Sequence, residues 1–396
     1  MDIGRAQGVI GGMYGDEGKG MMTCLLSKAM IERYGQCTVA RYNSSAQAGH
    51  TVEHEGKRHV FHHLGSGSLV GANTYLGPKF VAHPMLFHAE ADQLHKLGGN
   101  TQVFIDPRCL VSTPYDILIN QAIEKQRGNG RHGSCGIGFG ETIERSEKGN
   151  LILTVDDLRN PLRTREMLDT IRVDYLPKRL TALGLAPECV DPWRMDEGLL
   201  DRFMEDARFF LMRVQLADPE FLSNNTVFEG AQGLALDEEL GHFPYVTRSK
   251  TGLPYLTQLC EEASIEQVDL HYGTRAYTTR HGAGPLMHEG RTTPPGFSDQ
   301  TNLSNDYQGS IRLAHLDPAL LATLVARDLE RHQGGVHLRH GFWVSCLDQM
   351  GETTELSDLS LSTNLLPEYL REKMSGAWIS QGWGADTQAW RLPDHA

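Results

Sequence analysis

A glycine-rich stretch close to the N-terminus constrains the fold more than any other part of the sequence. It lies between a short apolar run, residues 8–11, and a segment from Met21 to Met30 in which apolar residues recur at helical spacing. Glycines in residues 12–20 let main-chain N–H groups converge on an anion, and the following helix adds the positive end of its dipole. The pattern predicts strand, phosphate-binding loop and helix; a tight turn without a ligand is the alternative.

The charged residues of this loop indicate what kind of phosphate site it is. Lys19 supplies a point positive charge, and Asp16 supplies a carboxylate that can act as a base or hold Mg²⁺. The motif GxxxxGK[ST] does not fit, because Met13 stands where the first glycine is required and Gly20 follows the lysine. The loop is therefore not that of an ordinary P-loop NTPase.

Strand and helix patterns alternate along the rest of the chain. Strands are expected at residues 39–42, 101–105, 226–228 and 344–347, and helices at residues 114–124, 195–216 and 318–331, the last capped by Asp317. This order predicts an α/β fold with a mostly parallel central sheet flanked by helices, like that of P-loop NTPases. Residues 128–140 and 289–309 are expected to be long active-site loops. Without a linker or repeat, residues 1–396 are expected to form a single domain.

Composition excludes several classes of function. The chain has 37 basic and 50 acidic residues and a net charge of −13, which argues against broad binding to nucleic acid. No run of 18 apolar residues exists, so no membrane span is expected. Seven scattered cysteines without a CxxC pair favour a reduced, cytoplasmic protein over a disulfide scaffold or a zinc site.

Several segments, in order, carry a resemblance to a known family. Residues 15–20 (GDEGKG) resemble the signature of the adenylosuccinate synthetase family, and residues 48–51 (AGHT) resemble its second motif. The later segments that also match are residues 228–233 (FEGAQG), 243–247 (FPYVT), 276–280 (AYTTR), 282–285 (GAGP), 347–348 (LD) and 380–382 (SQG). The matches extend over residues 8–386, so we identify the chain as similar to this family.

The resemblance implies a ligation in two steps. A nucleoside triphosphate, GTP or ATP, phosphorylates O6 of a purine nucleoside monophosphate. The amino group of L-aspartate then displaces the phosphate from C6. Replacing an oxo group by phosphate turns a poor leaving group into a good one, which divides one difficult step into two easier ones. The resemblance also implies a homodimer in which an arginine reaches the partner's site; Arg145 and Lys148 are the candidates for that position here.

Residue roles follow from the resemblance, position by position. Asp16 takes the proton from N1 of the purine, and His50 stabilises charge on the transferring phosphoryl group. Mg²⁺ is implied as the cofactor, next to Asp16 and the main-chain carbonyl of Gly49. Donor-nucleotide contacts are implied at Gly15, Glu17, Gly18, Lys19, Gly20, Thr51, Asp348, Ser380 and Gly382. Acceptor-nucleotide contacts are implied at Gln47, Ser134, Cys135, Gln232, Thr247 and Arg280, and aspartate contacts at Ser310 and Arg312.

Asp348 bears on the choice of donor. A carboxylate at this position accepts hydrogen bonds from N1–H and the 2-amino group of guanine, and adenine has neither donor. Asp348 therefore favours GTP over ATP. In the family, a lysine stands beside this aspartate, whereas Cys346 occupies its place here. The loss removes a stacking or carbonyl-binding partner of the donor base.

The other departures from the family pattern concern the acceptor and aspartate. An arginine-rich aspartate loop is replaced by residues 304–312, of which Arg312 is the only arginine. Ser134 and Cys135 stand in a loop that usually carries threonine and arginine, and Gln47 replaces an asparagine. Chemistry is thus retained while the substrate side changes.

Three hypotheses about the substrate remain open from the sequence. The first is a dGMP or GMP acceptor, as in the phage branch of the family that makes the precursor of 2-aminoadenine. That branch commonly replaces the catalytic aspartate by a small residue, whereas Asp16 is present here. The second is an IMP acceptor. The third is a protein that binds GTP without catalysing ligation.

Overall fold

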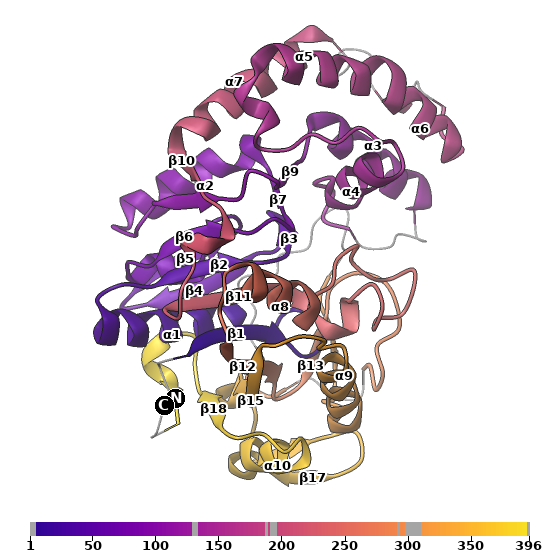
Figure 1. Cartoon of the computed structure of the whole chain (residues 1–396). Coiled ribbons are helices and arrows are strands. Elements are labelled where there is room, and N and C mark those ends of the chain that lie inside the picture. Colours follow the sequence, from indigo (N-terminus) through magenta and orange to yellow (C-terminus); the bar gives the residue numbers. More distant parts are fainter. Residues whose placement is uncertain are drawn as a thin grey trace.

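The computed structural model describes residues 5–128, 134–186, 189–190, 196–290, 294–297 and 310–393. Its main feature is a ten-stranded sheet (Figure 1) in the order β10-β8-β6-β2-β11-β1-β12-β15-β18-β19. Every neighbouring pair is parallel except β18 and β19, at one edge. The mostly parallel sheet expected from the sequence is confirmed. The strands are β1 Ala6–Gly11, β2 Thr38–Arg41, β6 Asn73–Leu76, β8 Val103–Ile105, β10 Val214–Leu216, β11 Thr226–Gly233, β12 Gln267–Arg275, β15 His337–Ser345, β18 Ile379–Gly382 and β19 Trp390–Arg391.

Helices connect and cover these strands. They are α1 Lys19–Tyr34, α2 Pro84–Lys96, α3 Pro114–Arg127, α4 Phe139–Glu147, α5 Pro161–Thr170, α6 Leu176–Ala182, α7 Glu197–Arg213, α8 Leu253–Glu262, α9 Pro318–Glu330 and α10 Leu366–Lys373. In Figure 1, α5, α6 and α7 form an arch at the top of the view, beyond α2 and α3. No helix in the described ranges is both long and apolar enough to cross a membrane.

Four small sheets lie outside the central one. They are β3 Ser44–Ser45 with β7 Phe80–Ala82 and β9 Leu110–Val111; β4 His50–His54 with β5 Lys57–Phe61; β13 Thr278–Arg280 with β14 Arg312–Ala314; and β16 Thr353–Glu355 with β17 Ser360–Ser362. Two of these elements, β4 and β13, bring segments of the family motifs toward the central sheet.

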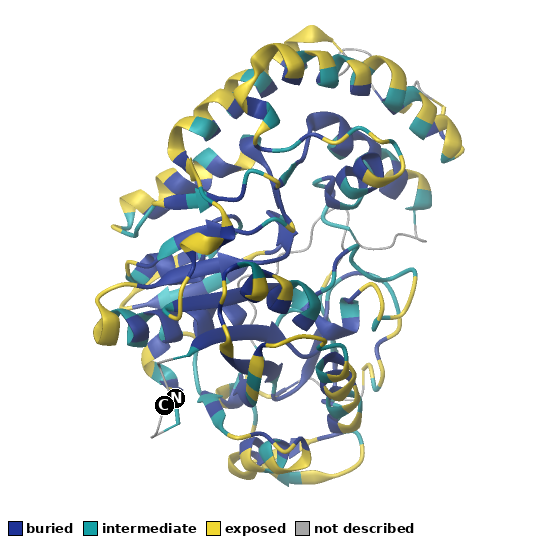
Figure 2. Cartoon of the chain, viewed as in Figure 1, coloured by how far each residue is buried: buried dark blue, intermediate teal, exposed yellow. Residues whose placement is uncertain are grey.

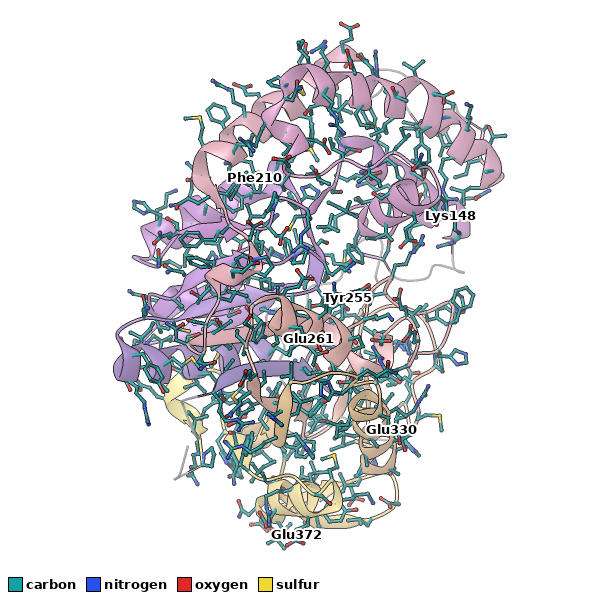
Figure 3. All side chains as sticks on the ribbon, viewed as in Figure 1. Lys148, Phe210, Tyr255, Glu261, Glu330 and Glu372 are labelled. Carbon is teal, nitrogen blue, oxygen red and sulfur yellow. The ribbon has the colours of Figure 1, made fainter. Side chains whose placement is uncertain are left out.

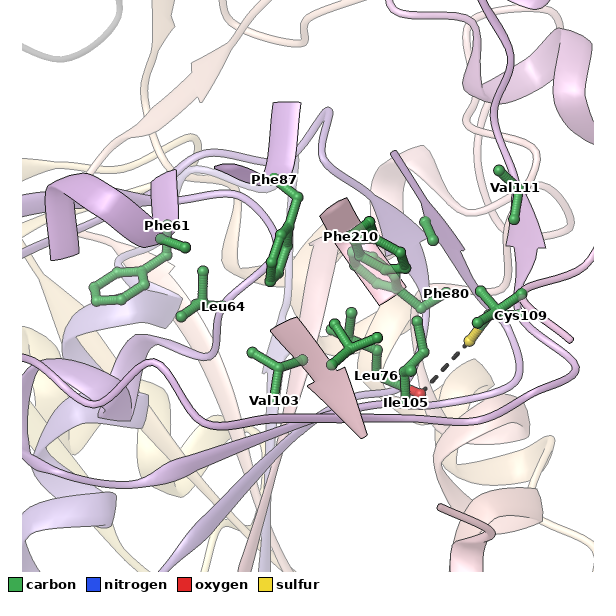
Figure 4. Close-up of a cluster of buried hydrophobic side chains, with 14 of the residues drawn as sticks. Phe61, Leu64, Leu76, Phe80, Phe87, Val103, Ile105, Cys109, Val111 and Phe210 are labelled. Carbon is green, nitrogen blue, oxygen red and sulfur yellow. Dashed lines mark hydrogen bonds between the residues drawn. The ribbon is translucent and has the colours of Figure 1, made fainter. Parts of the chain in front are cut away.

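The core has two apolar clusters, one on each face of the central sheet. Val9 and Val39 belong to one cluster, and their chain neighbours Ile10 and Ala40 belong to the other. This alternation follows from the period of two along a strand, and both faces are buried, as expected for a parallel sheet. Figure 2 shows the buried strands as a continuous band between exposed helix faces. Figure 4 shows the first cluster where strands β6 and β8 meet Phe87 and Phe210 from α2 and α7.

The predicted elements agree with the structure in position and differ at their ends. The expected helix at residues 318–331 is α9, and Asp317 caps it by accepting from the main-chain N–H groups of Ala319 and Leu320 at 3.0 Å each. The strand expected at residues 344–347 was wrong at its end. It is the last part of β15 and stops at Ser345, because Cys346 adopts a left-handed conformation with φ of 59° and turns the chain out of the sheet. Helix α4 begins at Phe139, inside the expected loop 128–140.

Candidate functional site

A cavity of about 370 Å³ lies at the glycine-rich loop, beside the carboxyl ends of β12 and β15. We call it the loop cavity. This is where ligands bind in open α/β sheets. It is lined by Gly15, Asp16, Gly18, Lys19, Gly20, Met21, Gly49, His50, Thr51, Glu53, Arg275, Gly296, Ser345, Cys346, Asp348, Gln349, Gly384, Ala385 and Trp390. Most of the predicted donor-side residues are therefore brought together, although they come from segments far apart in the sequence.

The loop is held in shape by its own glutamate. Gly15 and Gly18 have φ values of 99° and 84°, which residues with a side chain rarely adopt. The Glu17 carboxylate accepts from the main-chain N–H groups of Gly15 at 2.7 Å and Met13 at 3.2 Å. Burial raises the pKa of Glu17, and the nearby Lys19 opposes that shift. Glu17 points inward and is not a lining residue, so it shapes the loop instead of facing the cavity as predicted.

Lys19 is buried at the start of α1 and lines the loop cavity. Its Nζ donates to the carbonyl of Gly15 at 2.6 Å and lies 3.4 Å from a carboxylate oxygen of Glu17. These contacts place a fixed positive charge beneath the loop, where phosphate oxygens are expected.

His50 forms a buried ion-pair network that the sequence did not reveal. Its Nδ1 lies 2.6 Å from Oε1 of Glu229, and the Glu229 carboxylate also accepts from the N–H of Ser66 at 2.9 Å and from the Ser66 hydroxyl. Burial lowers the pKa of His50 to about 4 despite the opposing charge of Glu229. The pKa of Glu229 is also lowered, because His50 and Arg41 outweigh the effect of burial.

The short contact between Nδ1 and the Glu229 carboxylate shows which ring nitrogen carries a proton. Nδ1–H of His50 then donates to Glu229, an assignment made from this hydrogen bond. Nε2 is buried and has no hydrogen-bond partner among the described residues, which leaves it available to a ligand. Glu229 belongs to the segment FEGAQG, so the motif was visible in the sequence while the pairing with His50 was not.

Asp16 lies in the wall of the loop cavity and is paired with an arginine. Oδ2 of Asp16 lies 2.5 Å from Nη2 of Arg275, and the Thr279 hydroxyl donates to the same oxygen at 3.4 Å. Nε of Arg275 also donates to the main-chain carbonyl of Asp16. Arg275 stands directly before the segment AYTTR, and no motif in the sequence indicates its contact with Asp16.

The far end of the cavity contains the residues predicted to read the donor base. Asp348 is exposed and lines the cavity in the 3₁₀ turn Leu347–Gln349, next to Cys346. Ser380 and Gly382 lie in β18 and are not lining residues. Gly384, Ala385 and Trp390 form that wall instead. The donor contacts at Ser380 and Gly382 stay a prediction.

The lining residues fit a magnesium ion of the kind that binds with a nucleotide. Asp16 and Gly49 line the same cavity. In the described ranges no group of three or more His, Cys, Asp or Glu residues is arranged to hold a metal ion. Mg²⁺ commonly needs only one or two carboxylates, because substrate phosphates and waters complete its six ligands. One carboxylate and one carbonyl beside a phosphate loop therefore suffice.

A second cavity, of about 550 Å³, lies on the other side of the loop. Its lining includes Arg127, Arg179, Arg248 and Arg280, and we call it the arginine cavity. All six predicted acceptor-side residues line it: Gln47, Ser134, Cys135, Gln232, Thr247 and Arg280. Tyr14 lines the arginine cavity, whereas the next residues, Gly15 and Asp16, line the loop cavity.

The two cavities meet where the loop touches β11. A Cβ atom on Gly15 would lie 3.0 Å from Cα of Gln232, so only glycine fits there without a shift of the backbone. Gln232 itself has a positive φ of 65°. Backbone contact at this point leaves only a thin wall between the cavities.

Polar side chains on the arginine cavity bond to one another. Nε2 of Gln47 donates to the Thr247 hydroxyl at 3.3 Å, and the Ser134 hydroxyl pairs with the Asn120 side chain at 3.0 Å. The Cys135 thiol donates to the carbonyl of Gln47 at 3.7 Å, and burial raises its pKa to about 11. Cys135 is thus a protonated wall residue and lacks the thiolate character of a nucleophile.

Arg280 is buried and anchors loops around the arginine cavity. Nη1 donates to the carbonyl of Pro285 at 2.7 Å and Nη2 to that of Tyr245 at 3.1 Å. The guanidinium carbon lies 4.7 Å from the centre of the Tyr14 ring. Two of its nitrogens therefore hold the wall in place.

Ion pairs line the mouth of the arginine cavity. Arg248 pairs with Glu144 and, at 2.9 Å, with Glu147, and Nε of Arg179 lies 2.9 Å from Glu141. The side chain of Lys148 is 71% exposed at this mouth (Figure 3), with Nζ 3.3 Å from Glu144.

Arg145 has a different position from Lys148. It is fully buried, with Nε 2.9 Å from Asp116 and Nη2 3.0 Å from the carbonyl of Val111. Arg145 and Lys148 were the two candidates for a basic residue that reaches a partner subunit. Arg145 does not fit this role, because its buried side chain is bound to Asp116 and Val111.

The two predicted aspartate-binding residues do not line either cavity. Ser310 is exposed. Arg312 forms a two-point contact with Glu289, at 2.7 Å for both pairs of atoms, and Nη1 donates to the carbonyls of Gly282 and Gly284 at 2.9 Å. Residues 304–309 of the expected aspartate loop lie outside the described residues.

Fold and site together define a nucleotide-binding α/β protein in which two cavities meet at a phosphate loop. A family model described as adenylosuccinate synthetase matches residues 8–304, and the chain belongs to this family. Adenylosuccinate synthetase of Nostoc punctiforme is 34% identical over 289 residues, which cover 71% of this chain and 62% of the relative. That of Trichodesmium erythraeum is 35% identical over 301 residues, with coverage of 72% and 63%. The chain thus spans less than two thirds of the length of these curated relatives.

Solved structures share the fold over almost the whole chain. Fully ligated adenylosuccinate synthetase from Plasmodium falciparum has a TM-score of 0.69 at 18% identity, covering 98% of this chain and all of that one. Succinoaminodeoxyadenylate synthetase from cyanophage S-2L, bound to dGMP and to dATP as an energy donor, has a TM-score of 0.58 at 16% identity. It covers 98% of this chain and 95% of the phage chain.

Proposed function

We propose that this protein is a nucleoside-triphosphate-dependent ligase that joins L-aspartate to C6 of a 6-oxopurine nucleotide through a 6-phosphoryl intermediate. The observation that carries the proposal is the placement of one short segment on two cavities: Tyr14 lines the arginine cavity, and Gly15 and Asp16 line the loop cavity. Direct phosphoryl transfer between two nucleotides requires the two sites to meet at the transferred group. Family membership supports the same chemistry.

The residues of the loop cavity account for the first step. Asp16 accepts the proton from N1 of the purine, which makes O6 nucleophilic. Lys19 and the loop amides bind the donor phosphates. His50, whose Nδ1–H is held by Glu229, donates its Nε2–H to the transferring phosphoryl group in its protonated form. Mg²⁺, held beside Asp16 and Gly49, neutralises charge on the phosphates when it is bound.

The acceptor we propose is dGMP or GMP, with formation of the 2-aminoadenine precursor. The departures from the family at Gln47 and Cys135 both lie on the arginine cavity, whereas Lys19 and His50 are retained in the loop cavity. The phage structure with the same fold was solved with dGMP.

IMP is the competing acceptor, and the similarity to curated adenylosuccinate synthetases favours it. The deciding experiment incubates the protein with GTP, Mg²⁺ and L-aspartate, and with IMP, GMP or dGMP in turn. Phosphate release that requires both aspartate and one nucleotide, together with a succinyl product in the mass spectrum, identifies the acceptor. Greatest turnover with IMP would overturn the guanylate assignment. No release with any of the three would overturn the ligase and leave a protein that only binds GTP.

We also propose GTP as the donor, a homodimer as the assembly and the cytoplasm as the location. Asp348 at the far end of the loop cavity supports GTP. The exposure of Lys148, which lines the arginine cavity, is compatible with the homodimer. Light scattering coupled to gel filtration tests the assembly, and a mass of about 44.0 kDa would contradict the dimer.

A further inference from the structure

Arg275 occupies a position that neither the phosphate motif nor the family roles explain. It is the last residue of β12 and pairs in register with Ser345 at the end of β15. Its side chain is 13% exposed, and it lines the loop cavity. A cation at the carboxyl edge of the sheet, in the wall of a phosphate site, is placed to act on the groups bound there.

Two atoms of the Arg275 guanidinium hold one residue. Nε donates to the main-chain carbonyl of Asp16, and Nη2 lies 2.5 Å from Oδ2 of the same residue. Because both donors belong to one planar group, the contact fixes the direction of the Asp16 carboxylate as well as the position of its backbone. A lysine, with a single charged nitrogen, does not provide this fork.

The third nitrogen connects Arg275 to the base end of the cavity. Nη1 donates to the Tyr277 hydroxyl at 3.1 Å, and that hydroxyl donates to Oε1 of Gln349 at 2.5 Å. Gln349 lines the cavity beside Asp348. A chain of hydrogen bonds therefore runs from Gln349, the neighbour of the proposed donor-base contact, through Tyr277 and Arg275 to Asp16.

Arg275 supplies one of the few positive charges in the wall of the loop cavity. Among the described lining residues, Lys19 and Arg275 are the only lysine and arginine. Lys19 is directed at Gly15 and Glu17. Cys346 stands here in place of the family's lysine beside the base-reading aspartate. Arg275 lies on the neighbouring strand, β12, and its side chain contacts Asp16.

We propose that Arg275 is a positioning residue of the phosphoryl-transfer site, which holds the Asp16 carboxylate at the boundary between the two cavities. The inference rests on the proposed ligase function, since it assigns Arg275 a task in that reaction. Tyr277 and Gln349 keep the guanidinium in place. A shift of about 1 Å in a catalytic group is enough to lower turnover about 100-fold.

The test compares Arg275→Ala and Arg275→Lys with Arg331→Ala. Arg331 is a matched control, because its side chain is 15% exposed and pairs with Asp237 at 3.0 Å, away from both cavities. We expect Arg275→Ala to lower kcat about 100-fold, with the KM for the acceptor changed less than about threefold. Added guanidinium ion should restore part of kcat, and Arg275→Lys should retain more activity than Arg275→Ala. Arg331→Ala should lower the melting temperature and leave kcat of the folded protein unchanged.

Nucleotide binding separates this inference from the ligase proposal. Calorimetry with Mg²⁺ and a non-hydrolysable GTP analogue on Asp16→Asn, Arg275→Ala and the double variant measures the coupling of the two residues without turnover. Non-additive changes of about threefold or more in Kd support the positioning role. Additive changes overturn it, even if the wild type is an active ligase. If the wild-type protein shows no ligation with any acceptor, the proposed function is overturned. The binding measurements still show whether Asp16 and Arg275 are coupled.

Discussion

The two cavities differ in how their walls are built. The loop cavity is formed by the glycine-rich loop, by the carboxyl ends of the neighbouring strands β12 and β15, and by the segments 49–53, 348–349 and 384–385. The arginine cavity is assembled from α3, α4 and the segments around residues 243–248 and 280–283. A wall built on strand ends is fixed by the sheet register, whereas a wall built on loops and helix surfaces accepts changes in its side chains.

This difference accounts for the departures from the family at Gln47 and Cys135, on the arginine cavity, but not for Cys346, which lines the loop cavity. In the proposed reaction Lys19 and His50 act on the transferring group, and such residues must keep their geometry to within fractions of an ångström. Residues that recognise the rest of a nucleotide can be exchanged together with the substrate. For the proposed ligase, unchanged residues at the transferred group beside altered acceptor contacts are thus the expected outcome of building one site from two kinds of wall.

The largest effect is expected at the boundary of the cavities. Asp16→Ala should lower turnover about 10²–10⁴-fold, the usual contribution of a general base, while donor binding measured by calorimetry remains. Glu53→Gln is the matched control, because Glu53 is another carboxylate on the loop cavity and pairs with Arg58 away from it. Turnover of Asp16→Ala close to that of the wild type would remove Asp16 as the base.

A smaller loss is expected for the carboxylate behind His50. Glu229→Gln weakens a charged hydrogen bond worth about 1.5–3 kcal/mol, which corresponds to about a 10- to 100-fold fall in kcat. It also leaves the buried Arg41 without its charge partner, so the melting temperature should fall. Steady-state kinetics and thermal unfolding measure the two effects.

Glu90→Gln distinguishes catalysis from stability in this comparison. Glu90 forms a second buried pair with a histidine, at 3.1 Å from His63, and lines neither cavity. This variant should lose stability and keep kcat. Equal loss of kcat in both variants would show that Glu229 serves only the fold.

The contents of the loop cavity could largely be predicted from the sequence, because they lie in short motifs. Strand, glycine loop and helix follow one another directly, so Lys19 and Asp16 were placed by local pattern alone. The ion pairs could not be predicted in this way. Arg275 and Asp16 are 259 residues apart, and no local pattern states that the register of β12 brings them together.

For the arginine cavity, the sequence did not predict the hydrogen-bond partners of the arginines. Its predicted residues do line it, yet Arg280 is occupied by two carbonyls, and Arg312 outside it is occupied by Glu289. A side chain's donors are shared among all acceptors within reach, and those acceptors come from loops whose folding the sequence pattern does not specify. Residue type therefore predicted location better than it predicted hydrogen-bond partners.

A still smaller effect is expected at Asp348, which concerns the choice of donor nucleotide in the loop cavity. Asp348→Asn removes the acceptor pair for N1–H and the 2-amino group of guanine, while the phosphate contacts stay intact. We expect the ratio of kcat/KM for GTP to that for ATP to fall about tenfold or more. The measurement is competition between the two donors at fixed acceptor and aspartate. An unchanged ratio would show that the donor base does not lie against Asp348.

The smallest effect is expected at the mouth of the arginine cavity. Arg248 follows Thr247 directly and lines this cavity, but its charge is shared with Glu144 and Glu147. Because these glutamates and the solvent screen the guanidinium, Arg248→Ala should raise the KM of the acceptor nucleotide only about three- to tenfold. The KM of the donor should stay constant in this variant. Arg159→Ala is the control, because it removes an exposed arginine that lines neither cavity, and the KM values of acceptor and donor should both stay constant in it. Equal rises in both KM values for Arg248→Ala would mean that the two cavities do not bind separate nucleotides.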